Sequence, residues 1–241
     1  KRMGKIGVRS GVCDGFIGNR MLSAYRTAAD HMVLDGASPY QVDQAIVGFG
    51  FPMGPYQVGD LAGLDIGYAT RQRKAPTRDP RERVPVFADR LAEAGRLGRK
   101  TGRGYYIYDE DSPQGRPDPE MAEMLDGIRR DLGITPRGFT PEEIQSRYMA
   151  AMVNEGAKIL DEGIAARASD IDVVLLHGYG FPRWKGGPMH WADAQGLDRI
   201  AADIARFAQE DPYFWQVSPL LARLADQGGK LADANTGKDA T

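Results

Sequence analysis

Apolar and polar residues recur at helical spacing along residues 15–36. If each residue turns the helical wheel by about 100°, one side of this segment is apolar and carries Met21, Tyr25, Ala28, Ala29 and Met32. The opposite side is polar and carries Asn19, Ser23, Arg26 and Asp30, with His31 on its flank. The pattern therefore predicts a long helix that buries its apolar side and exposes its polar side.

Shorter helical patterns follow, separated by turns rich in glycine and proline. They predict helices over residues 38–49, 56–62 and 86–94, and another that Asp65 begins. Residues 71–83 are basic and proline-rich, and we expect a solvated loop there rather than a phosphate site. A glycine-rich crossing at 95–104 should lead into a short extended piece at 105–108.

The second half of the chain starts with a new helix. Thr140-Pro141-Glu142-Glu143 combines a capping hydroxyl, a proline at the first helical position and a glutamate that can close a capping box. The preceding segment, rich in proline and acidic residues, is typical of a linker. We therefore predict a first domain over residues 1–110, a linker over 111–139 and a second domain over 140–241.

The two halves repeat one another at an offset of about 130 residues. Residues 20–36 correspond to 147–163, and the Gly-Phe-Pro of 50–52 corresponds to that of 180–182. Gly-Pro at 54–55, Asp60 and Gly-Leu-Asp at 63–65 recur at 187–188, Asp193 and 196–198. The second copy has Ser146 where the first has Asn19, so only the first copy carries an amide at the start of its helix.

Composition excludes several classes of function. The 31 lysines and arginines balance 33 acidic residues, so no net field favours nucleic acid as a partner. The one cysteine, Cys13, forms no internal disulfide and lies in no metal-binding pattern, and we predict no metal site. No apolar run reaches the roughly 18 residues that a membrane span needs, and no signal peptide is seen, so we expect a cytoplasmic protein. The chain opens at Lys1 rather than methionine, which suggests a piece of a longer chain.

Asn19 is the candidate functional residue. Glycines at 15 and 18 let the backbone come close to a ligand, and the amide that follows offers two donors and one acceptor. Asparagine is also a favoured helix cap, so a purely structural role remains open. Gly48-x-Gly50 is not a dinucleotide motif, because a helix precedes it and proline interrupts it.

The motifs together resemble the C-terminal domains of 3-hydroxyacyl-CoA dehydrogenase. Three stretches of the first copy carry the resemblance: Gly-Phe-Ile-Gly-Asn-Arg at 15–20, Gly-Phe-Pro-Met-Gly-Pro at 50–55 and the run from Arg96 to Tyr106. The second copy, with Met-Val-Asn-Glu at 152–155, is similar to the end of multifunctional fatty-acid oxidation enzymes. The resemblance implies an all-α fold of two tandem helical domains, like the C-terminal domain of 6-phosphogluconate dehydrogenase, packed as a pseudo-dimer to which Tyr148 and Met152 contribute.

The same resemblance implies the function. Such enzymes oxidise 3-hydroxyacyl-CoA with NAD, which is bound by a Rossmann domain that also holds the catalytic histidine and glutamate. That domain is not in this sequence, and a crotonase-like domain is expected further upstream. Asn19 matches the family's active-site asparagine, and Ser23 is a candidate for substrate binding on the same surface. We expect the piece to be inactive alone, and a homo-oligomer is compatible with the resemblance.

Two alternatives stay open. A non-enzymatic helical interaction or dimerisation module would use the glycine-rich turns only to shape helix packing. Another hydroxyacid dehydrogenase with a similar helical domain would use a different substrate. For His31, His177 and His190 we expect structural or surface roles rather than proton transfer, because no sequence signal supplies a carboxylate to orient the imidazole.

Overall fold

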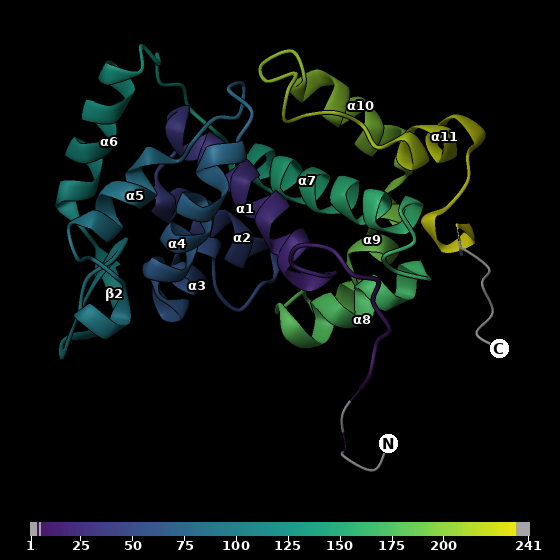
Figure 1. The fold of residues 1–241 in the computed structure, drawn as a ribbon, viewed down its shortest axis with the longest axis horizontal. Helices are drawn as coiled ribbons and strands as arrows, with labels where there is room; N and C mark the ends of the chain where they lie inside the picture. Colours follow the sequence, from purple (N-terminus) through teal and green to yellow (C-terminus); the bar gives the residue numbers. More distant parts are fainter. Residues whose placement is uncertain (1–3, 5, 235–241) are drawn as a thin grey trace. The chain divides into compact units, whose positions relative to one another are not determined.

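The computed structural model describes residues 4 and 6–234 and shows a mainly helical chain (Figure 1). In the first half of the chain the α-helices are α1 (Gly18–Leu34), α2 (Pro39–Phe49), α3 (Pro55–Ala62), α4 (Leu64–Lys74), α5 (Val86–Glu93) and α6 (Pro119–Asp131). In the second half they are α7 (Pro141–Asp161), α8 (Ala168–Gly178), α9 (Pro188–Gln195), α10 (Leu197–Phe207) and α11 (Pro219–Gln227). The predicted all-α class is confirmed.

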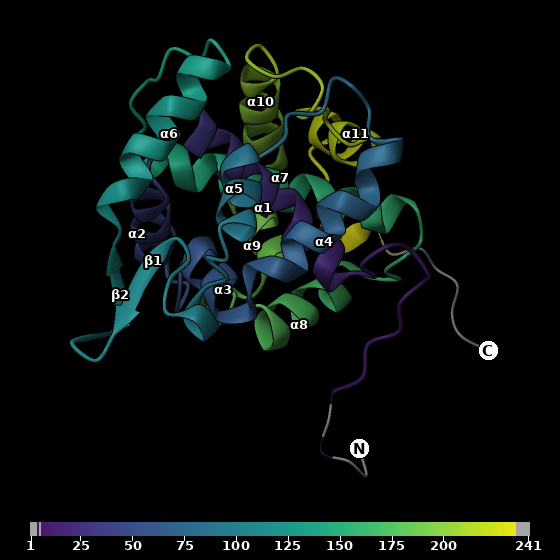
Figure 2. The same cartoon turned by 60° about the vertical axis from the view of Figure 1, so that its left-hand side comes forward.

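Short elements complete the described part. Single 3-10 turns are η1 (Ala75–Thr77), η2 (Arg99–Thr101), η3 (Arg183–Lys185) and η4 (Leu231–Asp233). Strands β1 (Tyr106–Asp109) and β2 (Ser112–Pro117) form an antiparallel hairpin, with Tyr106 opposite Pro117 (Figure 2). Among the helices described, none combines the length and the apolar character required to cross a bilayer.

The chain divides into two compact units whose limits differ from those of the sequence repeats. The first unit holds the residues up to Ala28 and those from Ser146 onward, and the second runs from Ala29 to Gln145. Helices α1 and α7, the first long helix of each repeat, both continue from one unit into the other. The predicted domains 1–110 and 140–241 therefore describe the sequence repeats and not these compact units. The start of the first repeat belongs to the same unit as most of the second repeat.

In the first unit, the start of α1 packs against α7. The rings of Tyr25 and Tyr148 lie 4.8 Å apart, and Met152 on α7 is fully buried. On the same side the guanidinium of Arg20 donates to Glu155 at 2.6 Å and, with another nitrogen, to Glu162 at 2.8 Å. The predicted contact between the two repeats is therefore present at Tyr148, where it joins aromatic packing to an ion-pair cluster.

One buried aspartate in each unit explains the repeated Gly-Pro motif. Asp43 on α2 accepts hydrogen bonds from the backbone N–H groups of Tyr56 at 2.9 Å and Gln57 at 3.0 Å, in the first turn of α3. Any side chain at Gly54 would overlap this carboxylate. A remote carboxylate thus caps the helix, which satisfies N–H groups that a helix start leaves unpaired.

The second repeat uses the same device. Asp172 on α8 accepts from the backbone N–H groups of Met189 at 2.7 Å and His190 at 3.2 Å, at the start of α9, and a Cβ at Gly187 would overlap it. Glycine is required just before each proline because the capping carboxylate occupies the place of a side chain. The two repeats therefore share the same cap, in which a buried aspartate accepts hydrogen bonds from the first turn of the next helix.

Asp172 makes stability depend on pH. Burial raises the pKa of Asp172 to about 6, against 3.8 ordinarily, although hydrogen bonds from the backbone N–H groups of Met189 and His190 act in the opposite direction. The folded chain therefore holds a proton that the unfolded chain has already released between about pH 4 and pH 6. This contribution to stability is complete below the unfolded pKa and is lost as pH rises through the folded pKa. Its size is up to about 3 kcal/mol.

The measurement is the midpoint of thermal unfolding of wild type and Asp172→Asn across this pH range. We expect the wild type to lose stability relative to the variant as pH rises from about 4 to about 6. Asp198→Asn, at an exposed position on α10, is the matched control and should run parallel to wild type. Parallel curves for wild type and Asp172→Asn would contradict this linkage.

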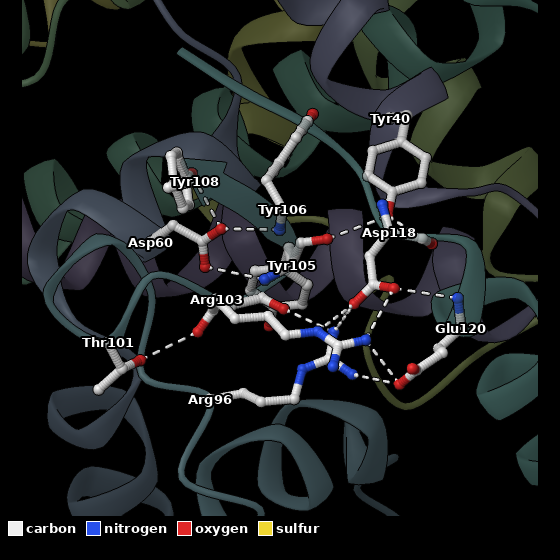
Figure 3. Close-up of polar contacts among 11 residues, drawn as sticks. Tyr40, Asp60, Arg96, Thr101, Arg103, Tyr105, Tyr106, Tyr108, Asp118 and Glu120 are labelled. Atoms are coloured by element: carbon white, nitrogen blue, oxygen red, sulfur yellow. Dashed lines mark hydrogen bonds and ion pairs between the residues drawn. The ribbon is translucent and has the colours of Figure 1, made fainter. Parts of the chain in front are cut away.

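A second pair of aspartates organises the loops. The carboxylate of Asp60 accepts from the backbone N–H groups of Tyr105 and Tyr106 and from the hydroxyl of Tyr108, each at 3.0 Å (Figure 3). Its repeat partner Asp193 accepts from the backbone N–H groups of Leu231 at 2.7 Å and Ala232 at 3.1 Å. Asp60 thus binds residues 105–106 to α3, and Asp193 binds residues 231–232 to α9.

The glycine-rich crossing serves this arrangement. A Cβ on Gly104 would overlap the carboxylate of Asp60, and one on Gly98 would overlap its backbone carbonyl. The basic side chains nearby are also engaged. Arg103 pairs with Asp118 at 2.9 Å (Figure 3), and Lys100 pairs with Asp65 at 2.5 Å. The crossing is therefore a packing device around Asp60.

Ion pairs also connect the glycine-rich crossing to the start of α6. Arg96 and Arg103 both reach the buried carboxylate of Asp118, which also caps α6 by accepting from the backbone N–H of Glu120 at 3.0 Å. Burial pushes the pKa of Asp118 upward, but the hydrogen bonds from Arg103 and Glu120 and the charge of Arg96 outweigh it, and the pKa lies below its ordinary value. The carboxylate therefore stays ionised within this cluster.

Residues 111–139, expected to be a linker, contain β2 and α6. The helix buries one face with Met121, Leu125 and Ile128, at the spacing of an amphipathic helix. Arg129 on α6 donates to the backbone carbonyls of Val33 at 2.7 Å and Ala37 at 2.9 Å, near the end of α1. The prolines and acids of this segment indicated an irregular linker, but the apolar spacing between them forms a packed helix.

The basic stretch 71–83 is also more ordered than expected. Its first residues belong to α4, which continues to Lys74 and is followed by η1. Arg71 pairs with Asp89 at 2.6 Å, and Arg83 donates to Asp35 at 3.0 Å. These arginines connect helices of the second unit.

Candidate functional site

The site predicted from the sequence lies where the chain enters α1, within the first unit. Gly15 has a φ of 85° and Phe16 a φ of 50°, a conformation that side chains other than glycine rarely adopt. The backbone N–H of Asn19 donates to the carbonyl of Gly15 at 3.1 Å. Because α1 begins at Gly18, Asn19 lies inside the first turn rather than at the cap position.

Asn19 is exposed, and its side chain has a partner from the second repeat. The hydroxyl of Tyr179 donates to Asn19 Oδ1 over 2.8 Å. The ring of Tyr179 lies so close to Gly18 that a Cβ there would overlap it. Gly18 is therefore needed to bring the tyrosine to the amide, which explains the second glycine of the motif.

Burial raises the pKa of Tyr179, so its hydroxyl keeps its proton at neutral pH and remains a donor. With Oδ1 directed at that hydroxyl, Nδ2 and its two protons form the other end of the amide. An exposed amide donor fixed at a helix start can bind an oxygen of a ligand. The arrangement thus offers hydrogen-bond donors rather than an acid or a base.

Ser23 lies one turn further along the same face of α1 and is also exposed. Its backbone carbonyl accepts from the hydroxyl of Thr27 at 2.9 Å. Arg20 follows Asn19 in sequence, but its side chain points to α7. Hydrogen bonds to Glu162 and Glu155 raise the pKa of Arg20 there. The structure therefore keeps Asn19 and Ser23 on one exposed strip and removes Arg20 from it.

The polar strip is shorter than the wheel predicted. Asp30, expected on the exposed side, is buried and accepts from the hydroxyl of Tyr56 at 3.1 Å, and His31 is buried as well. The reason is that this end of α1 lies in the second unit, where residues 29–34 are all buried. Only the first half of the helix is free to present a polar face.

The described residues do not fit a dinucleotide. A Rossmann site needs parallel strands with a glycine-rich turn into a helix, whereas β1 and β2 form an antiparallel hairpin. Gly50, which mimics such a turn in sequence, is the C-cap of α2. In this part of the chain there is also no group of three or more His, Cys, Asp or Glu side chains arranged for a metal.

Sequence reasoning missed Tyr179 as a partner of Asn19, and it assigned no role to Asn154. Asn154 is buried on α7, where its amide donates to the carbonyl of Gln216 and accepts from the N–H of Ser218, both at 2.8 Å. It is therefore a structural asparagine. For Tyr179 a signal existed, because it stands before Gly-Phe-Pro where the first repeat has Phe49, but its proximity to Asn19 depends on the fold.

Comparison with known proteins identifies both repeats. The model of the 3-hydroxyacyl-CoA dehydrogenase C-terminal domain matches residues 15–108 and again residues 144–237. Peroxisomal bifunctional enzymes of Danio rerio and Homo sapiens are 42% identical to this chain, and the matches cover 95% of it. The peroxisomal fatty acid beta-oxidation multifunctional protein AIM1 of Arabidopsis thaliana is 34% identical over 99% of the chain. The chain spans about a third of the length of these relatives.

Solved structures agree in fold. The 3-hydroxybutyryl-CoA dehydrogenase of Escherichia coli K12 has a TM-score of 0.68 at 22% identity, and the match covers 93% of this chain and 62% of that one. The dehydrogenase part of multifunctional enzyme 1 from C. elegans also has a TM-score of 0.68, at 28% identity, covering 88% of this chain and 48% of that one.

The relatives also correct one prediction. We expected a cytoplasmic protein from the absence of a recognisable signal, but these relatives are named as peroxisomal enzymes, and others as glyoxysomal ones. Composition carries no information on this point. The family match covers most of the chain in two copies, and the chain therefore belongs to the 3-hydroxyacyl-CoA dehydrogenase family, as a tandem pair of its C-terminal domains.

Proposed function

We propose that this chain is the substrate-side helical part of an enzyme that oxidises 3-hydroxyacyl-CoA to 3-oxoacyl-CoA in fatty-acid β-oxidation. The observation that supports it is the exposed amide of Asn19 within the Gly-Phe-Ile-Gly-Asn-Arg motif, in a chain that matches the family domain twice. The plant relatives are named as fatty acid beta-oxidation multifunctional proteins and are about three times its length.

Asn19 would act as a hydrogen-bond donor. As the 3-hydroxyl becomes a carbonyl, negative charge develops on its oxygen once the proton is taken away. A donor already fixed near that oxygen binds the transition state more strongly than the alcohol. Ser23, on the same strip of α1, would contact the substrate further from the reacting carbon.

The remaining chemistry belongs outside this chain. The family is NAD-dependent, and we assign the binding of NAD, together with the base that removes the proton, to a nucleotide-binding domain upstream. A crotonase-like domain would precede it, as the multifunctional relatives suggest. The described residues supply amide donors and no fitted nucleotide site, so we expect this piece alone to be inactive.

The test compares this chain with the longer natural protein that contains it. Each is mixed with a 3-hydroxyacyl-CoA and NAD, and NADH formation is followed by absorbance. We expect turnover from the longer protein only, and none from the longer protein once residues corresponding to this chain are removed. Turnover that survives this removal, or a longer protein that ignores 3-hydroxyacyl-CoA but oxidises free hydroxyacids, would contradict the proposal.

A further inference from the structure

The two repeats differ at two positions whose side chains meet. Asn19 of the first copy is replaced by Ser146 in the second, and Tyr179 of the second copy is replaced by Phe49 in the first. The one pairing that retains both polar groups is Asn19 with Tyr179, joined at 2.8 Å. Ser146 instead donates to Asp203 at 2.9 Å. The two losses are matched, as expected if the two polar groups act together.

The tyrosine is held firmly enough to orient the amide. It ends α8, where its backbone N–H donates to the carbonyl of Leu175 at 3.2 Å. Its ring is half-buried against Gly18, and burial keeps its hydroxyl protonated by raising the pKa of Tyr179. The neighbouring Phe181 is fully enclosed and anchors the same turn. The position of the hydroxyl is thus set by the second repeat.

We propose that Tyr179 is a positioning residue for Asn19 and that supplying it is the role of the second repeat in the reaction. This inference rests on the proposed function. The terminal torsion of asparagine has two nearly equivalent settings, which exchange the positions of oxygen and nitrogen. By donating to Oδ1, Tyr179 selects the setting that leaves both Nδ2 protons for the substrate oxygen.

The same geometry explains why a copy without the active-site asparagine keeps this turn. A helical domain with Ser146 cannot offer an amide, yet its Tyr179 completes the site of the other copy within one unit. Both residues lie in the first unit, which contains the start of α1 and the second repeat.

The first test uses this chain itself and needs no activity. In nitrogen-15 NMR spectra, the Asn19 side-chain signals are those that vanish in Asn19→Ala. In Tyr179→Phe, which keeps the ring over Gly18, we expect these signals to move toward those of a freely rotating amide. Gly18→Ala should move them too, because a Cβ there displaces the ring. Tyr68→Phe, which removes a hydroxyl bonded to Glu93, should leave them unchanged.

The second test is a mutant cycle in the longer natural enzyme. Tyr179→Phe should lower kcat about three- to tenfold with KM within about twofold, the scale of one lost neutral hydrogen bond. In the Asn19→Ala background the same change should have no further effect, because its target is gone.

The outcomes separate the two proposals. Unmoved Asn19 signals in Tyr179→Phe, or an equal loss of kcat from Tyr179→Phe with and without Asn19, would overturn the positioning role and leave the proposed function intact. Asn19→Ala without effect on turnover would overturn the proposed function, even if the NMR signals move as expected.

Discussion

Asn19→Ala in the longer natural enzyme is expected to lower kcat about ten- to a thousandfold, the usual effect of removing one donor aimed at a developing oxyanion. The loss should fall on kcat more than on KM, because the bond strengthens only as charge grows on the substrate oxygen. The change is also expected to leave folding nearly intact, since the side chain is exposed and its bond to Tyr179 lies at the surface of the unit.

Two further variants sharpen this experiment. Asn19→Asp keeps the shape but replaces two donors by a negative charge, so its kcat should be at or below that of the alanine variant. Gln195→Ala removes an exposed amide from α9 and should retain wild-type turnover. If Asn19→Ala were as active as Gln195→Ala, the helical interaction module, which assigns no catalytic role to this residue, would be the better account.

Asp60→Ala is expected to destabilise the second unit by about 3 to 5 kcal/mol, the largest effect on stability that we predict for a single substitution. The carboxylate is buried and accepts from the N–H groups of Tyr105 and Tyr106 and from the hydroxyl of Tyr108. Removing it strands buried donors, each at a cost of about 1 to 3 kcal/mol. Gly104, which leaves room for this carboxylate, has no side chain to replace it.

The measurement is urea unfolding followed by circular dichroism. Asp65→Ala is the matched control, because Asp65 lies nearby on α4 but is exposed, and its pair with Lys100 contributes little in water. A midpoint for Asp60→Ala equal to that of Asp65→Ala would show that the loops at Tyr105 and Tyr108 are held by other contacts.

Most helix boundaries were predictable because their signals are local. Ser38-Pro39 predicted the start of α2, where Ser38 indeed caps through Gln41, and Thr140-Pro141 predicted the start of α7, where the N–H of Glu143 donates to Thr140. Caps, prolines and apolar spacing act over a few residues, so one sequence suffices to read them. At 71–83 most residues are exposed as expected, although the stretch begins within α4. The expectation of an irregular linker at 111–139 failed because proline and acidic residues were given more weight than the apolar spacing of Met121, Leu125 and Ile128.

The sequence by itself determined the helical class, the duplication and the candidate Asn19, because each depends on residue order or on motifs that recur within the chain. Only the tertiary structure decided which side chains are buried and which residues distant in sequence come into contact. It buries Asp30 and His31 on a helix whose other half keeps Asn19 and Ser23 exposed, and it brings Tyr179 to Asn19 across 160 positions of sequence. The physical reason is that a side chain's surroundings depend on which elements pack around it, and no local pattern specifies the neighbours of a helix face.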